Sequence, residues 1–292
     1  MIRRASITSH LMAWGAIASM LSLSACERVV DITVPDGPTL LVVTARLEAM
    51  QGAPAITQRV LLTTTDGYFA NRASPAAIGA TVEVVDDLGN VTPFTEGVGT
   101  PGVFSSTSLV PAVGRAYTLR VMWQGDTYVA RDSVHPVAPI DSLWFRLRTT
   151  EIGPADGLRA TVGFTDVADR RDYYMWDQIV DGVRLVTPDT SFYWRQVNSD
   201  DLLDGQVMPA VQPYGGIVVR SGQVVTLRQM SLSAATYRFY TALNEQASTG
   251  GSPFSVPAAN LRGNVANVTT PTRRALGYFA ASEVSERTRV VP

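Results

Sequence analysis

The chain has 292 residues, with 24 basic and 26 acidic side chains and a net charge of −2. A chain with this charge, and with no basic cluster after its first 25 residues, is poorly suited to binding nucleic acid, because binding phosphates requires a basic face. Its single cysteine, Cys26, excludes an internal disulfide, and two histidines, His10 and His135, are too few for a zinc site built from several histidines.

The first 25 residues have the features of a bacterial export signal. An arginine pair gives a positive start, and residues 11–23 are apolar and uncharged but too short to span a bilayer. The run ends in a pattern similar to the bacterial lipobox, an aliphatic residue and two small residues before a cysteine: Leu23, Ser24, Ala25 and Cys26. We therefore expect residues 1–25 to be cleaved and Cys26 to carry the lipid anchor.

The residues after the cysteine bear on where the anchor holds the protein. Glu27 stands where an aspartate would favour retention in the inner membrane, so we expect the outer membrane. The sequence leaves open whether the protein faces the periplasm or the cell surface. Residues 26–38 are polar and contain proline, and form either a tether or a first edge strand.

Residues 39–134 are expected to form a first domain of about seven strands. Apolar, β-branched segments alternate with turn signals throughout this region. The strongest hairpin signal joins residues 117–123 to residues 127–132 through Gln124, Gly125 and Asp126. This pattern is typical of a β-sandwich of the immunoglobulin or transthyretin type.

A linker over residues 135–140, with Pro136 and Pro139, is expected to lead into a second domain at 141–292. Most of that domain again has the pattern of β-strands. The exception is residues 233–246, where aromatic and apolar side chains recur at helical spacing, Ser233 can cap the start and glycines follow the end. The expected fold is thus mainly β, with a second β-rich domain that carries one α-helix.

The order of several short motifs resembles one family, the outer-membrane lipoproteins grouped as domain of unknown function 4249. After Cys26 and the lead Val29–Pro35, these motifs are Gly79–Val82, Tyr117–Leu119, Pro139–Leu143, Asp172–Tyr174, the predicted helix with Tyr237 and Gln246, Phe254–Pro257, Arg262–Asn264 and Leu276–Phe279. The resemblance covers nearly the whole chain and brings no catalytic residues. It implies that the protein is a companion of a TonB-dependent outer-membrane transporter.

Aromatic residues are the main candidates for a ligand site. In strands, alternate side chains share a face, which places Tyr174 beside Trp176 and Phe192 beside Trp194. These four rings either stack on a ligand such as a sugar or form the core of a sheet. Phe254, after a Gly-Gly-Ser-Pro turn, is a candidate contact for a partner protein or a local plug.

Acidic residues offer a weaker candidate for a metal site. Asp200, Asp201 and Asp204 lie within residues 198–205 and carry the oxygen ligands that Ca²⁺ prefers, but their spacing is not that of an EF-hand, and a solvated loop is the alternative. His135 is expected to be an ordinary linker residue. No nucleophile-elbow or phosphate-loop motif occurs, so no catalytic residue, metal or cofactor is assigned.

These observations favour a non-enzymatic, lipid-anchored accessory protein of the outer membrane. It would bind a transporter, a ligand that the sequence does not identify, or both. The alternative is a glycan-active hydrolase, because that chemistry needs only a pair of Asp or Glu side chains.

The lipobox generates the first testable prediction. Cys26→Ser should release the protein from membranes or leave its signal uncut, because serine has no thiol to accept the lipid. Intact-mass analysis of the mature wild-type protein should show acyl chains on residue 26. Cleavage at another position, or an unmodified Cys26, would contradict this prediction.

Overall fold

The computed structural model describes residues 37–52, 55–67, 70, 72–149, 156–186, 195–248 and 261–292. Within them it contains sixteen strands and one helix, so the mainly-β fold with a single helix is confirmed. In chain order the elements are β1 (Leu41–Met50), β2 (Gln58–Thr64), β3 (Thr81–Asp86), β4 (Val91–Gly97), β5 (Thr100–Ser106), β6 (Ala116–Trp123), β7 (Asp126–Ser133), β8 (Ile140–Arg148), β9 (Gly157–Thr165), β10 (Tyr173–Val180), β11 (Val183–Arg184), β12 (Gln196–Ser199), β13 (Val207–Val211), β14 (Val224–Ser231), α2 (Ala234–Ser248), β15 (Ala266–Asn267) and β16 (Leu276–Val290).

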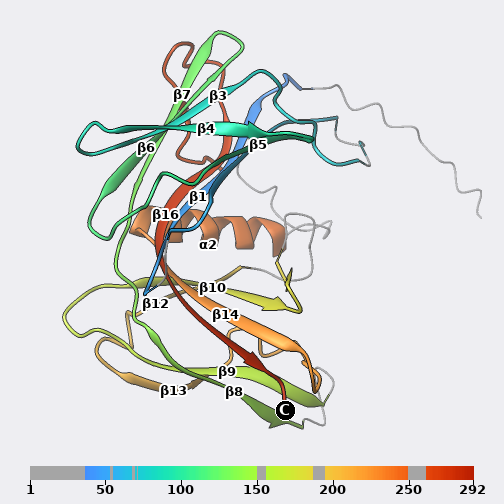
Figure 1. The fold of residues 1–292 in the computed structure, drawn as a ribbon, viewed down its shortest axis with the longest axis vertical. Coiled ribbons are helices and arrows are strands. Elements are labelled where there is room, and N and C mark those ends of the chain that lie inside the picture. Colours follow the sequence, from blue (N-terminus) through green and yellow to red (C-terminus); the bar gives the residue numbers. More distant parts are fainter. Residues whose placement is uncertain are drawn as a thin grey trace, which may run out of the picture. The chain divides into compact units, whose positions relative to one another are not determined.

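Thirteen of the strands form a large mixed sheet (Figure 1). Their order is β11-β10-β14-β16-β1-β2-β5-β4-β3-β6-β7-β15, and β12 pairs with β10 off this path. A smaller sheet has the order β13-β9-β8. The pair of β1 and β16 is parallel, whereas their other neighbours in the large sheet, β2 and β14, are antiparallel to them.

The first apolar core is that of a β-sandwich. Alternate residues of β1, beginning with Leu41 and Val43, are buried, and they meet buried residues of β3, β6 and β7 such as Leu119. β4 joins the two layers because it pairs with β3 through its first half and with β5 through its second, with a register shift between Glu96 and Gly97. The first half of β16 completes this core with Phe279 and Ala281.

A second apolar core lies between the smaller sheet and the β10–β14 end of the large sheet. It contains Val162 and Phe164 from β9, Tyr174 and Trp176 from β10, and Leu227 from β14. Side chains that alternate with these point to the opposite face of the large sheet. There Met175, Met230 and Val284 form a small third core.

Helix α2 covers that opposite face (Figure 1). Its first turn is capped by Ser233, whose Oγ lies 3.2 Å from the backbone nitrogen of Thr236. Tyr237 and Tyr240 pack on the third core, and the ring of Tyr237 stacks on Tyr173 at 4.8 Å. The helix therefore begins one residue after the expected start and ends two residues beyond the expected end.

The segment between the first two cores, residues 134–139, has no regular secondary structure but is closely held. The backbone nitrogen of Val137 donates to Glu283 Oε2 at 2.7 Å, and that of Ile140 donates to Ser285 Oγ at 2.9 Å. The hydroxyl of Ser231 donates to the carbonyl of His135 at 2.5 Å. These bonds fix the expected linker onto β14 and β16.

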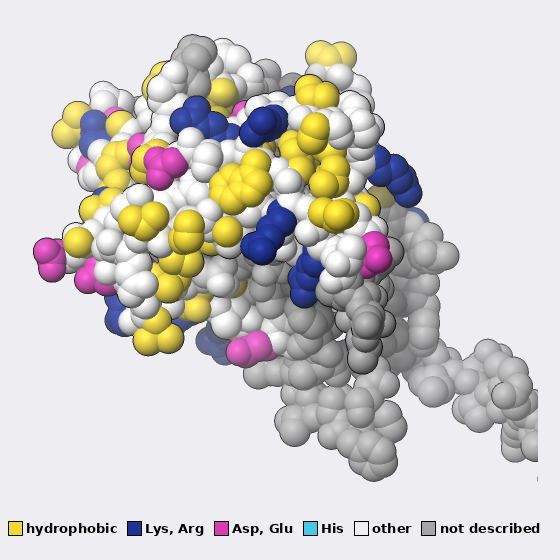
Figure 2. Space-filling model, turned by 90° about the horizontal axis from the view of Figure 1, so that it is seen from below, with side chains coloured by type: hydrophobic (Ala, Val, Ile, Leu, Met, Phe, Trp, Pro, Cys, Tyr) yellow, Lys and Arg dark blue, Asp and Glu magenta, His cyan; other side chains and the backbone are white. Residues whose placement is uncertain are grey.

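Figure 2 shows the side on which β8, β9 and β13 lie in Figure 1. Hydrophobic side chains and arginines are interspersed on this face. Exposed large hydrophobic residues of these strands include Leu147 on β8 and Val207 on β13. Within the described part of the chain, no helix has both the length and the apolar character needed to cross a membrane.

Strand β16 pairs with strands of both large cores. Residues 276–284 pair with β1, and residues 284–290 pair with β14. Contacts group Pro38–Pro292 into one compact unit. The division into domains at 39–134 and 141–292 stays a prediction, and the shared strand favours unfolding in one step.

Calorimetry of residues 26–292 tests this point. We expect a single thermal transition, with a calorimetric enthalpy equal to the van't Hoff enthalpy, because separating the cores would break the ladder of β16. Two resolved transitions would instead show that the sandwich folds independently of the second half.

Candidate functional site

A cavity of about 800 Å³ lies beside α2, between the helix and the chain segments on either side of β15. Aromatic and aliphatic lining residues include Phe239, Tyr240, Leu243 and Tyr278. Pockets of this size and apolar character, with a few polar groups, are typical binding sites for small molecules. It is therefore the candidate ligand site of the described part of the chain.

One wall of the cavity is fixed by the side chain of Asn264. Its Nδ2 donates to the carbonyl of Phe279 at 2.7 Å, and its Oδ1 accepts from the backbone nitrogen of Phe279 at 2.9 Å. The amide thus takes the place of a neighbouring strand and satisfies both backbone groups of one β16 residue. This bond pair holds residues 261–265 against the start of β16.

A second polar cluster holds the turn that follows β15. Asn267 Nδ2 donates to Asp126 Oδ2 at 3.0 Å, while its Oδ1 accepts from the backbone nitrogens of Thr269 and Thr270 at 3.0 and 2.8 Å. Asp126 also accepts from the Thr270 hydroxyl at 2.8 Å and from Arg273 at 3.0 Å. The hydrogen bonds from Thr270 and Asn267 hold the pKa of Asp126 below its ordinary value.

Two glycines bring three backbone segments together at the cavity. A Cβ on Gly277 would lie 1.9 Å from the carbonyl oxygen of Val43, and Gly277 has φ +87°, where other residues are strained. A Cβ on Gly263 would lie 1.6 Å from the carbonyl oxygen of Gly277. Both positions line the cavity and have no room for a side chain.

The helical side of the cavity is aromatic. Phe239 stacks on Tyr278 with ring centroids 4.3 Å apart, and Tyr240 lies 6.1 Å from the same ring. The guanidinium of Arg195 lies 5.5 Å from the centre of the Tyr240 ring, within the range of cation–π attraction. Arg195 is thereby placed at the cavity that it helps to line.

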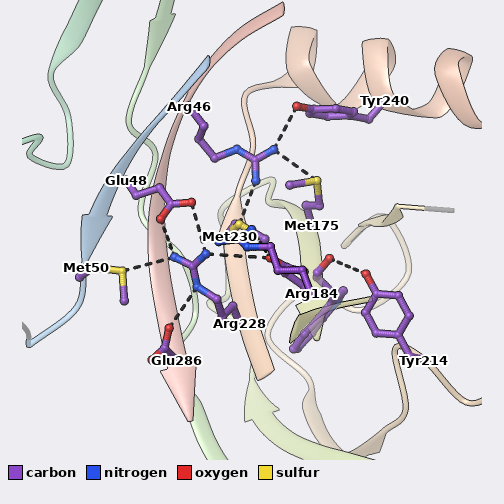
Figure 3. A network of polar contacts seen from close by, with 12 residues as sticks. Arg46, Glu48, Met50, Met175, Arg184, Tyr214, Arg228, Met230, Tyr240 and Glu286 are labelled. Carbon is purple, nitrogen blue, oxygen red and sulfur yellow. Dashed lines mark hydrogen bonds and ion pairs between the residues drawn. The ribbon is translucent and has the colours of Figure 1, made fainter. Parts of the chain in front are cut away.

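Arg46 connects this aromatic group to the sheet beneath (Figure 3). Its Nη2 donates to the hydroxyl of Tyr240 at 3.0 Å, and its Nη1 lies 2.9 Å from the sulfur of Met230. The guanidinium also lies 5.6 Å from the centre of the Tyr240 ring. Tyr240 is therefore fixed from within the protein.

Arg46 belongs to a buried charge cluster on the same face of the large sheet, shown in Figure 3. Its central guanidinium is that of Arg228, which is 4% exposed. Arg228 lies 2.5 Å from Glu48 on β1, 3.1 Å from Glu286 on β16 and 4.0 Å from Asp177 on β10. One arginine thus contacts carboxylates of three other strands, and Asp177 also pairs with Arg184.

Burial and pairing act against each other in this charge cluster. Burial raises the pKa of Glu48, but the attraction and hydrogen bond of Arg228 outweigh it and lower the pKa below its ordinary value. For Asp177, burial dominates over the attraction of Arg184 and Arg228, so its pKa is raised. The central guanidinium of Arg228 is 4% exposed and its partners come from three other strands, which indicates a role in holding strands together.

The aromatic residues proposed from sequence have different environments. Tyr174 and Trp176 share one face of β10, but that face is the second core, where both are buried against Phe164 at 5.9 and 5.7 Å. Tyr174 and Trp176 therefore form part of a sheet core, and their rings pack against other residues of the protein. Tyr173, on the other face of β10, joins the aromatic residues of α2.

The acidic loop brings three carboxylates together. Asp166, Asp200 and Asp204 each offer an oxygen within 4.8 Å of the others. Asp166 accepts hydrogen bonds from the Tyr174 hydroxyl and from the backbone nitrogen of Gly205, and Asp200 accepts from the backbone nitrogen of Asp172. The two buried carboxylates, Asp166 and Asp200, thus accept hydrogen bonds from the protein itself, and these bonds join the acidic loop to the start of β10.

Other sequence candidates are placed as follows. Asp172 forms a bidentate pair with Arg170, as in a charged turn, and His135 is exposed in the segment between the cores. Phe192, Trp194 and Phe254 lie outside the described residues, as do Leu23, Ser24, Ala25 and Cys26.

The residues that line the cavity were not predicted as a site from sequence. Phe239 and Tyr240 belong to the predicted helix, and Arg195 and Arg274 lie in no motif. One signal was present, because Arg262–Asn264 and Leu276–Phe279 were among the motifs that carried the family resemblance. The structure brings these two segments together through Asn264 and Phe279.

In the described part of the chain, the fold and the cavity define a class of mainly-β protein with a β-sandwich, a covering helix and a small-molecule-sized pocket beside that helix. The chain belongs to the family described as Domain of unknown function (DUF4249), whose model matches residues 27–288. No curated protein matches the chain.

The Asn264 bonds generate a stability prediction. Asn264→Asp should lower the free energy of unfolding by about 2–3 kcal/mol, because a carboxylate oxygen would face the Phe279 carbonyl without a proton to donate. Asn198→Asp, at an exposed position of β12, is the matched control and should change stability by less than about 0.5 kcal/mol. Equal losses in urea denaturation of the two variants would disprove the role assigned to Asn264.

Proposed function

We propose that the protein is a lipid-anchored accessory protein of the outer membrane that binds a small ligand in the cavity beside α2. In this proposal it serves as a companion of a TonB-dependent transporter in nutrient capture. The cavity is the observation that carries the binding part of the proposal. The lipobox at Cys26 and the family resemblance support the location and the partner.

The construction of the cavity supports a binding role. Its walls are held by Asn264, by the Asp126 cluster and by the contact of Arg46 with Tyr240. A lining fixed in this way needs little ordering when a ligand enters, and ordering is a large part of the free-energy cost of binding.

The alternative of a glycan-active hydrolase needs two carboxylates about 5–10 Å apart across a cleft. Among the described residues that line the cavity, none is an aspartate or a glutamate. The carboxylates of Asp166 and Asp200 are close together, but they are buried and bound to protein donors. The described geometry thus favours binding over hydrolysis at the cavity.

Membrane anchoring makes a weak protein interface sufficient. Partners confined to one membrane meet at a high effective concentration, so an interface of less than about 1,200 Å² can hold them together. The proposed anchor would also hold the protein in the membrane stably, because several acyl chains bind a membrane far more firmly than one chain does.

Chemical cross-linking in native outer membranes tests the partnership. We expect an adduct between this protein and a TonB-dependent transporter, identified by mass spectrometry. Cys26→Ser is the control, and it should lose the adduct because the unanchored chain no longer shares the membrane with its partner.

One combination of results would contradict the accessory role. If the wild-type protein runs as a free monomer without a transporter adduct, and the purified protein hydrolyses a glycan, the accessory role is wrong and the hydrolase alternative replaces it.

A further inference from the structure

We propose that the ligand of the cavity beside α2 is an organic anion: a carboxylate, sulfonate or phosphate group on an apolar body that contains rings. This inference rests on the proposed binding function and specifies its ligand class. The chemistry of the described lining residues carries it.

The charged side chains that line the cavity among the described residues are all positive. Arg195, Arg262 and Arg274 line the cavity, and no acidic side chain does so among the described residues. The chain as a whole has more acidic than basic residues and a net charge of −2. The positive charge of the lining is therefore not a consequence of a net positive charge of the chain.

These three arginines are available to a ligand. In the described part of the chain, none of them forms an ion pair with a carboxylate. By contrast, the neighbouring Arg273 forms an ion pair with Asp126 at 3.0 Å. A planar guanidinium matches the two oxygens of a carboxylate or phosphate, which makes arginine well suited to hold such a group.

The rest of the lining suits an apolar body. Phe239, Leu243 and Tyr278 present aromatic and aliphatic surface, and the stacked pair of Phe239 and Tyr278 offers a platform for a further ring. The volume of about 800 Å³ admits a molecule of two or three rings. A free inorganic anion would leave this apolar surface unused.

A matched pair of fluorescent dyes separates the anionic group from the apolar body. Anilinonaphthalene sulfonate and N-phenylnaphthylamine share the same linked rings, but only the first carries a negative charge. The protein is the mature chain, residues 26–292, produced without lipid so that no detergent takes up the dyes. We expect calorimetric titration to give one site for the anionic dye, with at least tenfold higher affinity than for the neutral dye.

Variants of the arginines then test the proposed contacts. Arg262 and Arg274 are exposed and form no ion pair in the described chain, so replacing both with glutamine should leave the fold intact. The double variant R262Q/R274Q should bind the anionic dye about 10–100-fold more weakly and the neutral dye unchanged, since each charged hydrogen bond contributes about tenfold in affinity. Arg220→Gln, at an exposed position outside the cavity, is the charge-matched control and should change neither affinity.

A filling variant ties the binding to this cavity. Leu243→Trp should weaken both dyes by at least tenfold because the larger side chain occupies the space of the ligand. If both dyes bind equally well and R262Q/R274Q changes neither, the anionic ligand class is wrong while the binding function stands. If neither dye binds, or if Leu243→Trp changes nothing, the cavity is not the ligand site and the proposed binding function fails with it.

Discussion

The architecture depends on the pairing of one strand, β16, with two neighbours that belong to different cores. Its first half lies parallel to β1 and supplies Phe279 to the sandwich, and its second half lies antiparallel to β14 beside the second core. Residues 286–290 of the second half are exposed, and Arg287 and Arg289 join this half to β8 by donating to the carbonyl oxygens of Ile140 and Leu143. The cavity lies where β16 begins, so its position follows from the same pairing.

A buried arginine reinforces this arrangement from the face covered by α2. Desolvation of a guanidinium is costly, and a buried ion that loses its partner destabilises a protein by about 3–5 kcal/mol. Glu48, Asp177 and Glu286 compensate that cost for Arg228, and they reach it because β1, β10, β14 and β16 are in register. The charge cluster thus favours this order of strands over others, whereas the apolar cores supply most of the free energy that stabilises the fold.

Local patterns predicted much of the secondary structure, because turn chemistry and alternation are properties of neighbouring residues. The hairpin of β6 and β7 is an example, with Gln124 and Gly125 at φ 50° and 81°, as a tight turn requires. The parallel pairing of β1 with β16 joins distant residues and has no local signal. The same holds for the cavity, whose arginines look like ordinary surface residues until Asn264 brings their segment to β16.

The place of β1 has a mechanical consequence under the proposed anchoring. β1 is the first strand of the described residues, and it is an interior strand with β2 on one side and β16 on the other. Ladder hydrogen bonds run across the strands, so a pull along β1 from the membrane shears both ladders at once rather than opening them one bond at a time. Traction between a membrane anchor and a moving partner would therefore meet the part of the sheet that yields least easily.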